Sequence, residues 1–542
     1  MITSDLGFTA RRFLYRLIHA PEEWLDRSVK WLIILNIMMN HKSVLALVRG
    51  TAVLVGVVSV LLGSLSPVQA AQSVTLAWNP DPGVAGYHLH YGTASGVYNQ
   101  TTDVGNTTTA TVPNLTPGLT YFFVVTAFNT AGLESLPSNE VSFTAALDRP
   151  AISAMQQSPN GGFQFTVTDA LDQTDSVYAS SDLATWTLLT TVVNTTGTFV
   201  VNDPEAANVE RRFYRVTDYG VTTDPAGFIT LLIAGSNGGQ SRAFSFLGIS
   251  MVNPVSYQGT ITSVGNYSVT DANATWSANE FNGTNGEFFI EITSGPYAGL
   301  MADILATDAA GETLTTDDDL SSLLTGGELY RIRKHRTLGD VFGENNESRL
   351  NGGSSISEAD EVSVLNPVTQ TFLTYYFKTG GFGGTGWRSA TDAVTDASGT
   401  TLYPDQGVLI VRKVSGDISL ILTGTVKTGP TIVPVGANIN MLANIYPAGT
   451  LTVANSGLYV GNDSLGLAGG ETASSADEVR IFDGETFQDL FYKTGGFGGT
   501  GWRNSTDAVA DAGNTQILPA SSIYVIRKYG RPAFNWAIPQ PF

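Results

Sequence analysis

The sequence predicts a nearly all-β protein built from several modules, and three observations support this fold class. Turn-forming Gly, Pro, Asn, Asp and Ser cluster about every 8–12 residues between runs rich in Val, Thr, Phe and Tyr, which is typical of antiparallel strands. No segment after residue 70 keeps a helical apolar period over three turns. The C-terminal half contains an internal duplication with a spacing of 115 residues.

Composition narrows the classes of function. Of the 542 residues, 14% are charged and 42% are hydrophobic, and the formal net charge is −20. This hydrophobic content is sufficient for buried cores, so a wholly disordered chain is excluded. The absence of cysteine excludes disulfides, Fe–S clusters and cysteine zinc sites. The acidic balance argues against a nucleic-acid partner.

The N-terminal region predicts export. Residues 39–70 read as a signal peptide, with Lys42 and Arg49 in a basic start, an apolar run at 51–62 and cleavage expected after Ala70. The apolar run is shorter than the ~20 residues that span a bilayer, so we expect no stable membrane span after cleavage. The predicted location is extracellular, at the cell surface or periplasmic.

The segment before the signal peptide has two interpretations. Residues 1–38 are an over-extended reading frame if Met39 is the true start, or an amphipathic extension that touches the membrane. The first interpretation is favoured because a complete signal peptide begins at Met39.

Residues 72–146 form the clearest module. Two alternating segments place their large apolar residues on one strand face, a turn leads into a strand rich in Phe and Val, and a closing strand follows. The residues with this pattern are Val74, Leu76, Trp78, Tyr87, Leu89 and Tyr91, followed by the 115–121 corner and the 138–141 ending. The module resembles a fibronectin type III domain. The resemblance implies an immunoglobulin-like sandwich, a fold that commonly serves as a spacer or binding module.

Residues 150–217 predict a second, short β module. Its expected strands are 163–168, 176–180, 184–189 and 212–216. The 180–186 stretch and the closing 211–216 run resemble a module that recurs in large exported bacterial proteins. That resemblance implies no activity.

The C-terminal region is predicted to be a pair of related β units. Residues 376–388 return almost unchanged as 491–503. The matches predict a first unit at 226–413 with an insertion near 266–336, a second unit at 414–528, and a tail at 529–542. The 246–254 and 335–343 segments and the paired Gly-Trp-Arg and Ile/Val-Arg-Lys elements resemble an uncharacterised family of exported bacterial β-repeat proteins. This resemblance also implies no activity.

The repeated Gly-Phe-Gly-Gly-Thr-Gly-Trp-Arg loops are the candidate binding sites. They fit a dinucleotide-binding pattern only formally, because no helix is expected after them, and a glycine-rich turn is favoured. Aromatic rings beside a guanidinium suit sugar rings and flat apolar ligands. The candidate ligand-binding residues are Phe382, Trp387, Arg388, Phe497, Trp502 and Arg503. The favoured alternative makes the Trp residues core and pairs the Arg residues with Asp392 and Asp507.

Acidic clusters and histidines give the remaining candidates. The clusters are Asp360-Glu361, Asp477-Glu478, Asp392/Asp396, Asp507/Asp511 and Asp317–Asp319. They suggest Ca²⁺ or a glycosidase pair, but a solvated acidic face or turn-capping Asp is favoured. His88 and His90 share one strand face without an evident third ligand, so we predict no metal site. No cofactor is expected, with Ca²⁺ as the alternative.

Together these observations predict a non-catalytic exported protein with a structural or adhesive role at the bacterial cell surface or in the extracellular matrix. Its expected partners are extracellular polysaccharide or surface proteins. The alternative is a carbohydrate-binding accessory protein that uses the duplicated loops. A third hypothesis is a glycoside hydrolase with an acidic pair. No catalytic residues are predicted.

Overall fold

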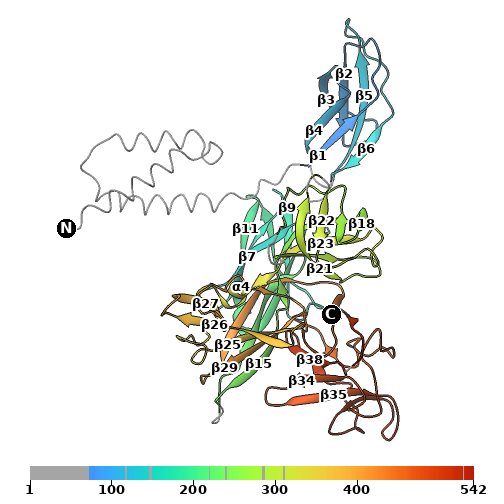
Figure 1. Ribbon diagram of the computed structural model, residues 1–542. Helices are drawn as coiled ribbons and strands as arrows, with labels where there is room; N and C mark the ends of the chain where they lie inside the picture. The colour runs from blue at the N-terminus through green and yellow to red at the C-terminus, as the bar shows by residue number, and fades with distance from the viewer. Residues whose placement is uncertain are drawn as a thin grey trace, which may run out of the picture. The chain divides into compact units, whose positions relative to one another are not determined.

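Short β-strands make up almost all the regular structure of the computed structural model, so the predicted all-β class is confirmed (Figure 1). The structure describes residues 72–115, 119–145, 149–171, 173–218, 220–237, 241–282, 287–308, 310, 312–528 and 530–542. The expected signal peptide and residues 1–38 lie outside this range. In the described part, no helix has the length and apolar character needed to cross a membrane. The chain divides after residue 146 into two compact units, which are described separately.

The first unit is a two-layer β structure. Its strands are β1 (Gln72–Ala77), β2 (Gly86–Gly92), β3 (Gln100–Gly105), β4 (Thr109–Leu115), β5 (Thr120–Phe128) and β6 (Val141–Thr144). One sheet has the order β3-β2-β5-β6, and β1 pairs with β4. Tyr87 and Leu89 alternate inward from β2, and the core includes Leu89, Val112 and Phe123.

The predicted 150–217 module is part of a larger sheet. Its elements are β7 (Ala151–Gln157), β8 (Phe163–Thr168), β9 (Gln173–Ser180), β10 (Thr187–Asn194), β11 (Thr198–Asp203), η2 (Pro204–Asn208), β12 (Arg211–Asp218) and β13 (Val221–Thr222). Strands β7, β8 and β11 form a small sheet, whereas β9, β10 and β12 continue into the sheet of the following unit. The strand expected at 184–189 begins only at Thr187, because Asp182 accepts hydrogen bonds from the Ala184 and Thr185 amides and fixes a turn there.

The two C-terminal units have the same strand order. The first contains β14 (Ala226–Ile233), β15 (Ala243–Gly248), β16 (Met251–Val252), β24 (Arg336–Thr337), α4 (Leu338–Phe342), β25 (Glu361–Asn366), β26 (Thr371–Thr379), β27 (Thr385–Ser389), β28 (Thr401–Leu402), β29 (Gly407–Arg412) and β30 (Ile418–Val426). The second contains β31 (Thr431–Val435), β32 (Ile439–Ala443), β33 (Leu451–Thr452), β34 (Glu478–Phe482), β35 (Phe487–Lys493), β36 (Gly501–Asn504), β37 (Gln516–Ile517), β38 (Ser522–Ile526) and β39 (Phe534–Ile538). The sheet β15-β29-β25-β26-β27 corresponds strand by strand to β32-β38-β34-β35-β36.

The strand pairing places the boundaries of these units at different residues from those predicted from the sequence. Strand β30 pairs with β14 over eight residues, although the sequence prediction places 414 onward in the second unit. Strand β39 pairs with β31, although 529–542 was expected to be a tail. The long hydrogen-bonded ladders explain both differences, because each unit begins with a strand that is covered by its own last strand.

The insertion in the first C-terminal unit is a curled sheet. Its strands are β17 (Val255–Thr260), β18 (Ser263–Gly265), β19 (Ser268–Thr270), β20 (Phe288–Ile292), β21 (Met301–Asp308), β22 (Thr313–Thr316) and β23 (Leu329–Lys334). The order is β17-β23-β20-β21-β22-β19-β18. Strands β17 and β18 follow each other in the chain but lie at opposite ends of this order, so the sheet curls toward a barrel. The insertion therefore starts earlier than the expected residue 266.

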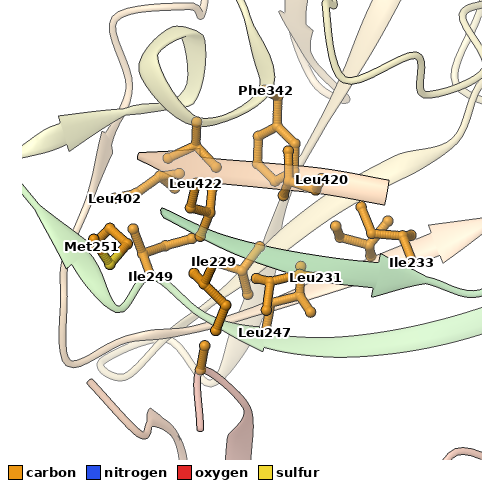
Figure 2. Packing of buried hydrophobic residues seen from close by; sticks show 14 of the residues in the cluster. Ile229, Leu231, Ile233, Leu247, Ile249, Met251, Phe342, Leu402, Leu420 and Leu422 are labelled. Carbon is orange, nitrogen blue, oxygen red and sulfur yellow. The ribbon is translucent and has the colours of Figure 1, made fainter. Parts of the chain in front are cut away.

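The largest core lies between β14, β30 and the elements around them. Ile229 and Leu231 are paired with Leu422 and Leu420 in register, and all four side chains are buried. Figure 2 shows these residues packed with Phe342 of α4 and with Leu247, Ile249 and Met251. Because this core joins the start and the end of the first unit, it fixes the sheet that holds the β26–β27 hairpin.

Candidate functional site

The duplicated glycine loops connect β26 to β27, both labelled in Figure 1, and β35 to β36. Gly383, Gly384 and Gly386 have φ values of +91°, +74° and +140°, which side-chain-bearing residues rarely adopt. Their counterparts in the second copy have nearly the same values, at Gly498, Gly499 and Gly501. The glycine-rich turn that the sequence favoured is therefore present in both copies.

The indole rings of Trp387 and Trp502 are buried, with 0% and 4% exposure. Trp387 packs against Phe342 and Phe377, and its Nε1 donates to the Gly343 carbonyl oxygen at 2.8 Å. A ligand that stacks on an aromatic face needs that face to be accessible. Neither indole meets this requirement, so the stacking role proposed for the two Trp residues is wrong.

The guanidinium groups of Arg388 and Arg503 are buried behind the loops and hydrogen-bond to backbone carbonyl oxygens of the loops and of the strands that follow them. Arg388 Nη1 donates to the Trp387 carbonyl oxygen at 2.6 Å and to Asp396 Oδ1 at 3.2 Å. Arg503 makes the same contacts, and its carboxylate partner is Asp511 at 3.3 Å. Both guanidinium groups are buried.

The expected partners of these arginines, Asp392 and Asp507, have another role. Asp392 Oδ1 accepts hydrogen bonds from the Val394 and Thr395 amides, and Asp507 caps the equivalent turn. Such short-range acceptance from backbone N–H groups is a common use of Asp in turns. The predicted Arg–Asp pairing is therefore wrong by four residues in each copy.

Two lysines complete the frame of the loops. The buried Lys378 donates through Nζ to the carbonyl oxygens of Phe382 and Ala393. Lys493 does the same with Phe497 and Ala508. Each lysine therefore ties a glycine loop to the turn that follows it. This role was not predicted, although the Lys-Thr-Gly-Gly run is repeated in the sequence.

The phenylalanines at the loop tips are the exposed members of the predicted site. Phe382 is 87% exposed and Phe497 is 86% exposed. Val394 and Val509, on the turns tied to these loops, are about half exposed. Each copy therefore presents a small apolar patch, defined by Phe382 with Val394 and by Phe497 with Val509.

The repeated Asp-Glu pairs are structural. Asp360 is buried and forms an ion pair with Arg412 Nε at 3.0 Å, and Asp477 forms one with Arg527 Nη1 at 3.0 Å. Each carboxylate also accepts the amide of the next residue, Lys413 or Lys528. The Asp360 and Asp477 carboxylates are therefore engaged in buried ion pairs and are not available for a solvated acidic face or for a catalytic pair.

A cavity of about 460 Å³ lies where the insertion meets the two C-terminal units. Its polar lining includes Asp303, Asp317, His335, Tyr403 and Asp405. His335 Nε2 lies 2.9 Å from Asp303 Oδ1. Burial raises the pKa of Asp317 and Asp405, and burial together with the charge of Asp303 raises the pKa of Tyr403 to about 12. Sequence reasoning did not bring these residues together, because they come from separate sheets.

The N-terminal unit, which ends at residue 146, contains a third group of candidate functional side chains. His88 and His90 lie on one face of β2, as expected, and Glu134 joins them from the segment that follows β5. Glu134 was not predicted, because nothing in the sequence around it indicates that this segment lies next to the histidines of β2. Among the described residues, this is the group of three whose ligand atoms lie close enough to hold a metal ion.

Comparison with known proteins identifies one module. Residues 64–144 match the fibronectin type III domain family. A 75-residue stretch, 14% of this chain, is 43% identical to a Kelch domain-containing protein of Saccharolobus solfataricus, of which it spans 10%. A two-domain fibronectin type III segment of chicken tenascin aligns with 29% of this chain and 91% of its own length, at 14% identity and a TM-score of 0.22. The family match agrees with the sequence pattern, and the chain contains a fibronectin type III domain.

Proposed function

We propose that this protein is a non-catalytic, exported binding protein with a structural or adhesive role at the bacterial cell surface or in the extracellular matrix. The proposal rests on one observation: two equivalent loops each present an almost fully exposed phenylalanine, Phe382 and Phe497. The fibronectin type III domain is consistent with such a role, because domains of this type are commonly spacers or binding modules.

An exposed phenylalanine leaves a large apolar surface in water. Burying such a ring is worth about 1.5–3 kcal/mol, which becomes available when a partner covers it. Lys378 and Arg388 donate to the carbonyl oxygens of Phe382 and Gly383 in the first loop and hold its backbone in place. A preordered anchor loses little conformational entropy on binding. The loops therefore combine the two properties of an interface hot spot, an aromatic anchor and rigidity.

Two copies of one loop, one in each C-terminal unit, suit a repetitive partner. If both patches engage the same polymer or surface, the second contact is intramolecular and overall binding strengthens without further contacts. The partners we propose are extracellular polysaccharide, whose sugar rings stack on aromatic faces, and repeated proteins of the cell surface. The carbohydrate-binding alternative therefore uses Phe382 and Phe497, with the buried Trp residues in a supporting role.

The test is binding of the full chain to immobilised polysaccharides and glycan arrays. In the Phe382→Ala/Phe497→Ala double variant we expect affinity to fall at least about tenfold, which corresponds to about 1.4 kcal/mol. Val368→Ala/Leu465→Ala is the matched control, because both side chains are exposed and apolar but lie outside the loops. Equal loss in both double variants, or no loss in the loop variant, would contradict a binding role for the loops.

The hydrolase hypothesis has one supporting observation. The cavity contains Asp303 beside Asp317, and burial with the charge of Asp303 raises the pKa of Asp317. A carboxylic acid of raised pKa next to a second carboxylate is the pairing that glycosidases use. Release of reducing sugar by the wild type, abolished in Asp317→Asn, would replace the binding proposal with this one.

A further inference from the structure

The fibronectin type III domain holds two histidines and a glutamate on one face. Alternation along β2 puts His88 and His90 on the same side of the sheet, opposite the buried Tyr87 and Leu89. Glu134 reaches them because its segment folds back and forms an antiparallel bridge with Phe128 at the end of β5. Three potential ligands therefore come from two places in the chain that are 46 residues apart.

Distances within the group suit one small cation. The nearest ligand atoms of the three side chains all lie within 4.8 Å of one another. His88 Nδ1 is 2.7 Å from Glu134 Oε1, and His90 Nε2 is 3.5 Å from Glu134 Oε2. The side chains are 25%, 19% and 38% exposed for His88, His90 and Glu134. A cation from solvent can therefore reach the group without opening the fold.

Neighbouring side chains already hold the ligands in position. His90 Nδ1 is 2.9 Å from Thr101 Oγ1, and its Nε2 lies 2.9 Å from Thr126 Oγ1 and 3.5 Å from Glu134 Oε2, so a bound cation would replace the hydrogen bond between Nε2 and Thr126. Thr126 Oγ1 donates to Glu134 Oε2 at 2.7 Å, and the Phe128 ring stacks on His88 with centroids 4.6 Å apart. Such outer contacts orient the ligands of natural metal sites.

We infer that His88, His90 and Glu134 form a binding site for a zinc-like divalent cation on the fibronectin type III domain. Two imidazoles and one carboxylate are a set of protein ligands that Zn²⁺ uses, with a fourth position left for water or another ligand. The nitrogen ligands disfavour Ca²⁺ and Mg²⁺, which prefer oxygen. This site lies in the fibronectin type III domain, and it does not depend on the duplicated loops or on the proposed function.

The test is Zn²⁺ titration of the full chain in competition with a chromogenic chelator, at neutral pH. We expect the wild type to bind Zn²⁺ and its affinity to fall at least about tenfold in Glu134→Gln and in His90→Gln, since even outer-shell substitutions cost 10–100-fold. Glu140→Gln is the matched control. Its carboxylate also accepts hydroxyl and amide hydrogens, from Ser95, Tyr98 and Gly96, but it lies in another group.

A second measurement separates ligand loss from misfolding. Circular dichroism and the unfolding temperature without metal should match in wild type, His90→Gln and Glu140→Gln, and Zn²⁺ should raise the unfolding temperature only where His90 is present. Co²⁺ should give the visible absorption of a nitrogen- and oxygen-ligated site in the wild type, absent in His90→Gln. Zn²⁺ affinity that is equal in all variants, or no Zn²⁺ binding by folded wild type, would overturn the inference. Unchanged Zn²⁺ binding in Phe382→Ala/Phe497→Ala would show that the two proposals are independent.

Discussion

Lys378 and Lys493 are buried ammonium groups that bond to backbone carbonyl oxygens. A buried lysine is usually found with a carboxylate, but here it satisfies carbonyls that the tight loop cannot pair within a strand ladder. The charge is therefore used to shape the loop. The exact repetition of these contacts at both loops shows that the sequence repeat encodes side-chain clamps as well as strands.

Buried carboxylates make a residue-scale prediction about pH. Asp175 of β9 is fully buried, and burial together with the nearby Asp169 and Asp218 raises its pKa to about 7. Its pKa in the unfolded chain is about 3.9, so the protonated form is favoured by folding. The stability that this acid contributes is complete below about pH 4 and is lost as the pH rises through about 7.

Asp175→Asn removes that titration. We expect the variant to gain at least about 1 kcal/mol over the wild type at pH 8, since one unit of pKa shift equals about 1.4 kcal/mol, and to gain much less at pH 4. Denaturant unfolding at both pH values measures the difference. Glu210→Gln, at an exposed carboxylate of the same module, should show no such pH dependence. A gain for Asp175→Asn that is equal at pH 4 and pH 8 would contradict the assignment.

At the scale of elements, the glycine loops distinguish two reasons why a position requires glycine: a positive φ and a close approach of backbone. Gly383 and Gly384 both have positive φ, which costs an alanine about 1–2 kcal/mol. A Cβ on Gly384 would meet no atom within 4 Å, whereas a Cβ on Gly383 would lie 2.6 Å from the Ala393 carbonyl oxygen. Gly383 is therefore required for conformation and for close approach, and Gly384 for conformation alone.

This difference predicts an order of stability. We expect Gly384→Ala to lower the free energy of unfolding by about 1–2 kcal/mol and Gly383→Ala to lower it further, because the backbone must shift to admit the methyl group. Chemical denaturation of the two variants beside wild type measures the order. The second copy is an internal replicate, since Gly498 has the same close contact and Gly499 has none. Equal losses at Gly383 and Gly384 would argue against the tie between the loop and the following turn.

The same elements show what the sequence predicts and what it leaves open. Local patterns predicted β8 over residues 163–168 and the paired glycine turns, because strand alternation and turn chemistry act between near neighbours. The sequence favoured a buried Trp387 but did not identify its hydrogen-bond partner, the carbonyl oxygen of Gly343 directly after α4, because that contact joins distant segments. Glu134 likewise meets His88 only through the fold of the first unit. Contacts between distant segments, which depend on strand register and tertiary packing, are therefore the part of the structure that could not be predicted from the sequence alone.

At the scale of the whole second unit, a buried charge cluster joins the insertion to the link between the two C-terminal units. Glu291 on β20, Arg333 on β23 and Lys427 just after β30 are at most 2% exposed. Lys427 Nζ lies 2.8 Å from Glu291 Oε1, and Arg333 Nε lies 3.4 Å from Glu291 Oε2. Burial alone would raise the pKa of Glu291, but the charges of Lys427 and Arg333 outweigh burial and lower it.

Removing one partner of this cluster should weaken the connection between the units. Lys427→Met leaves Glu291 buried without its closest cation, and breaking a buried pair typically costs about 3–5 kcal/mol. Lys427→Met/Glu291→Gln removes both charges, so we expect the double variant to be more stable than the single one. Denaturant unfolding followed by intrinsic fluorescence measures both. Because the pKa of Glu291 is lowered, the cluster's stabilisation is present above about pH 4.5 and lost as the pH falls further, so the cost of Lys427→Met should shrink in acid. A double variant less stable than Lys427→Met would contradict this expectation and would show that the buried Arg333, which then keeps Asp224 at 3.9 Å, depends on Glu291 more than Glu291 depends on Lys427.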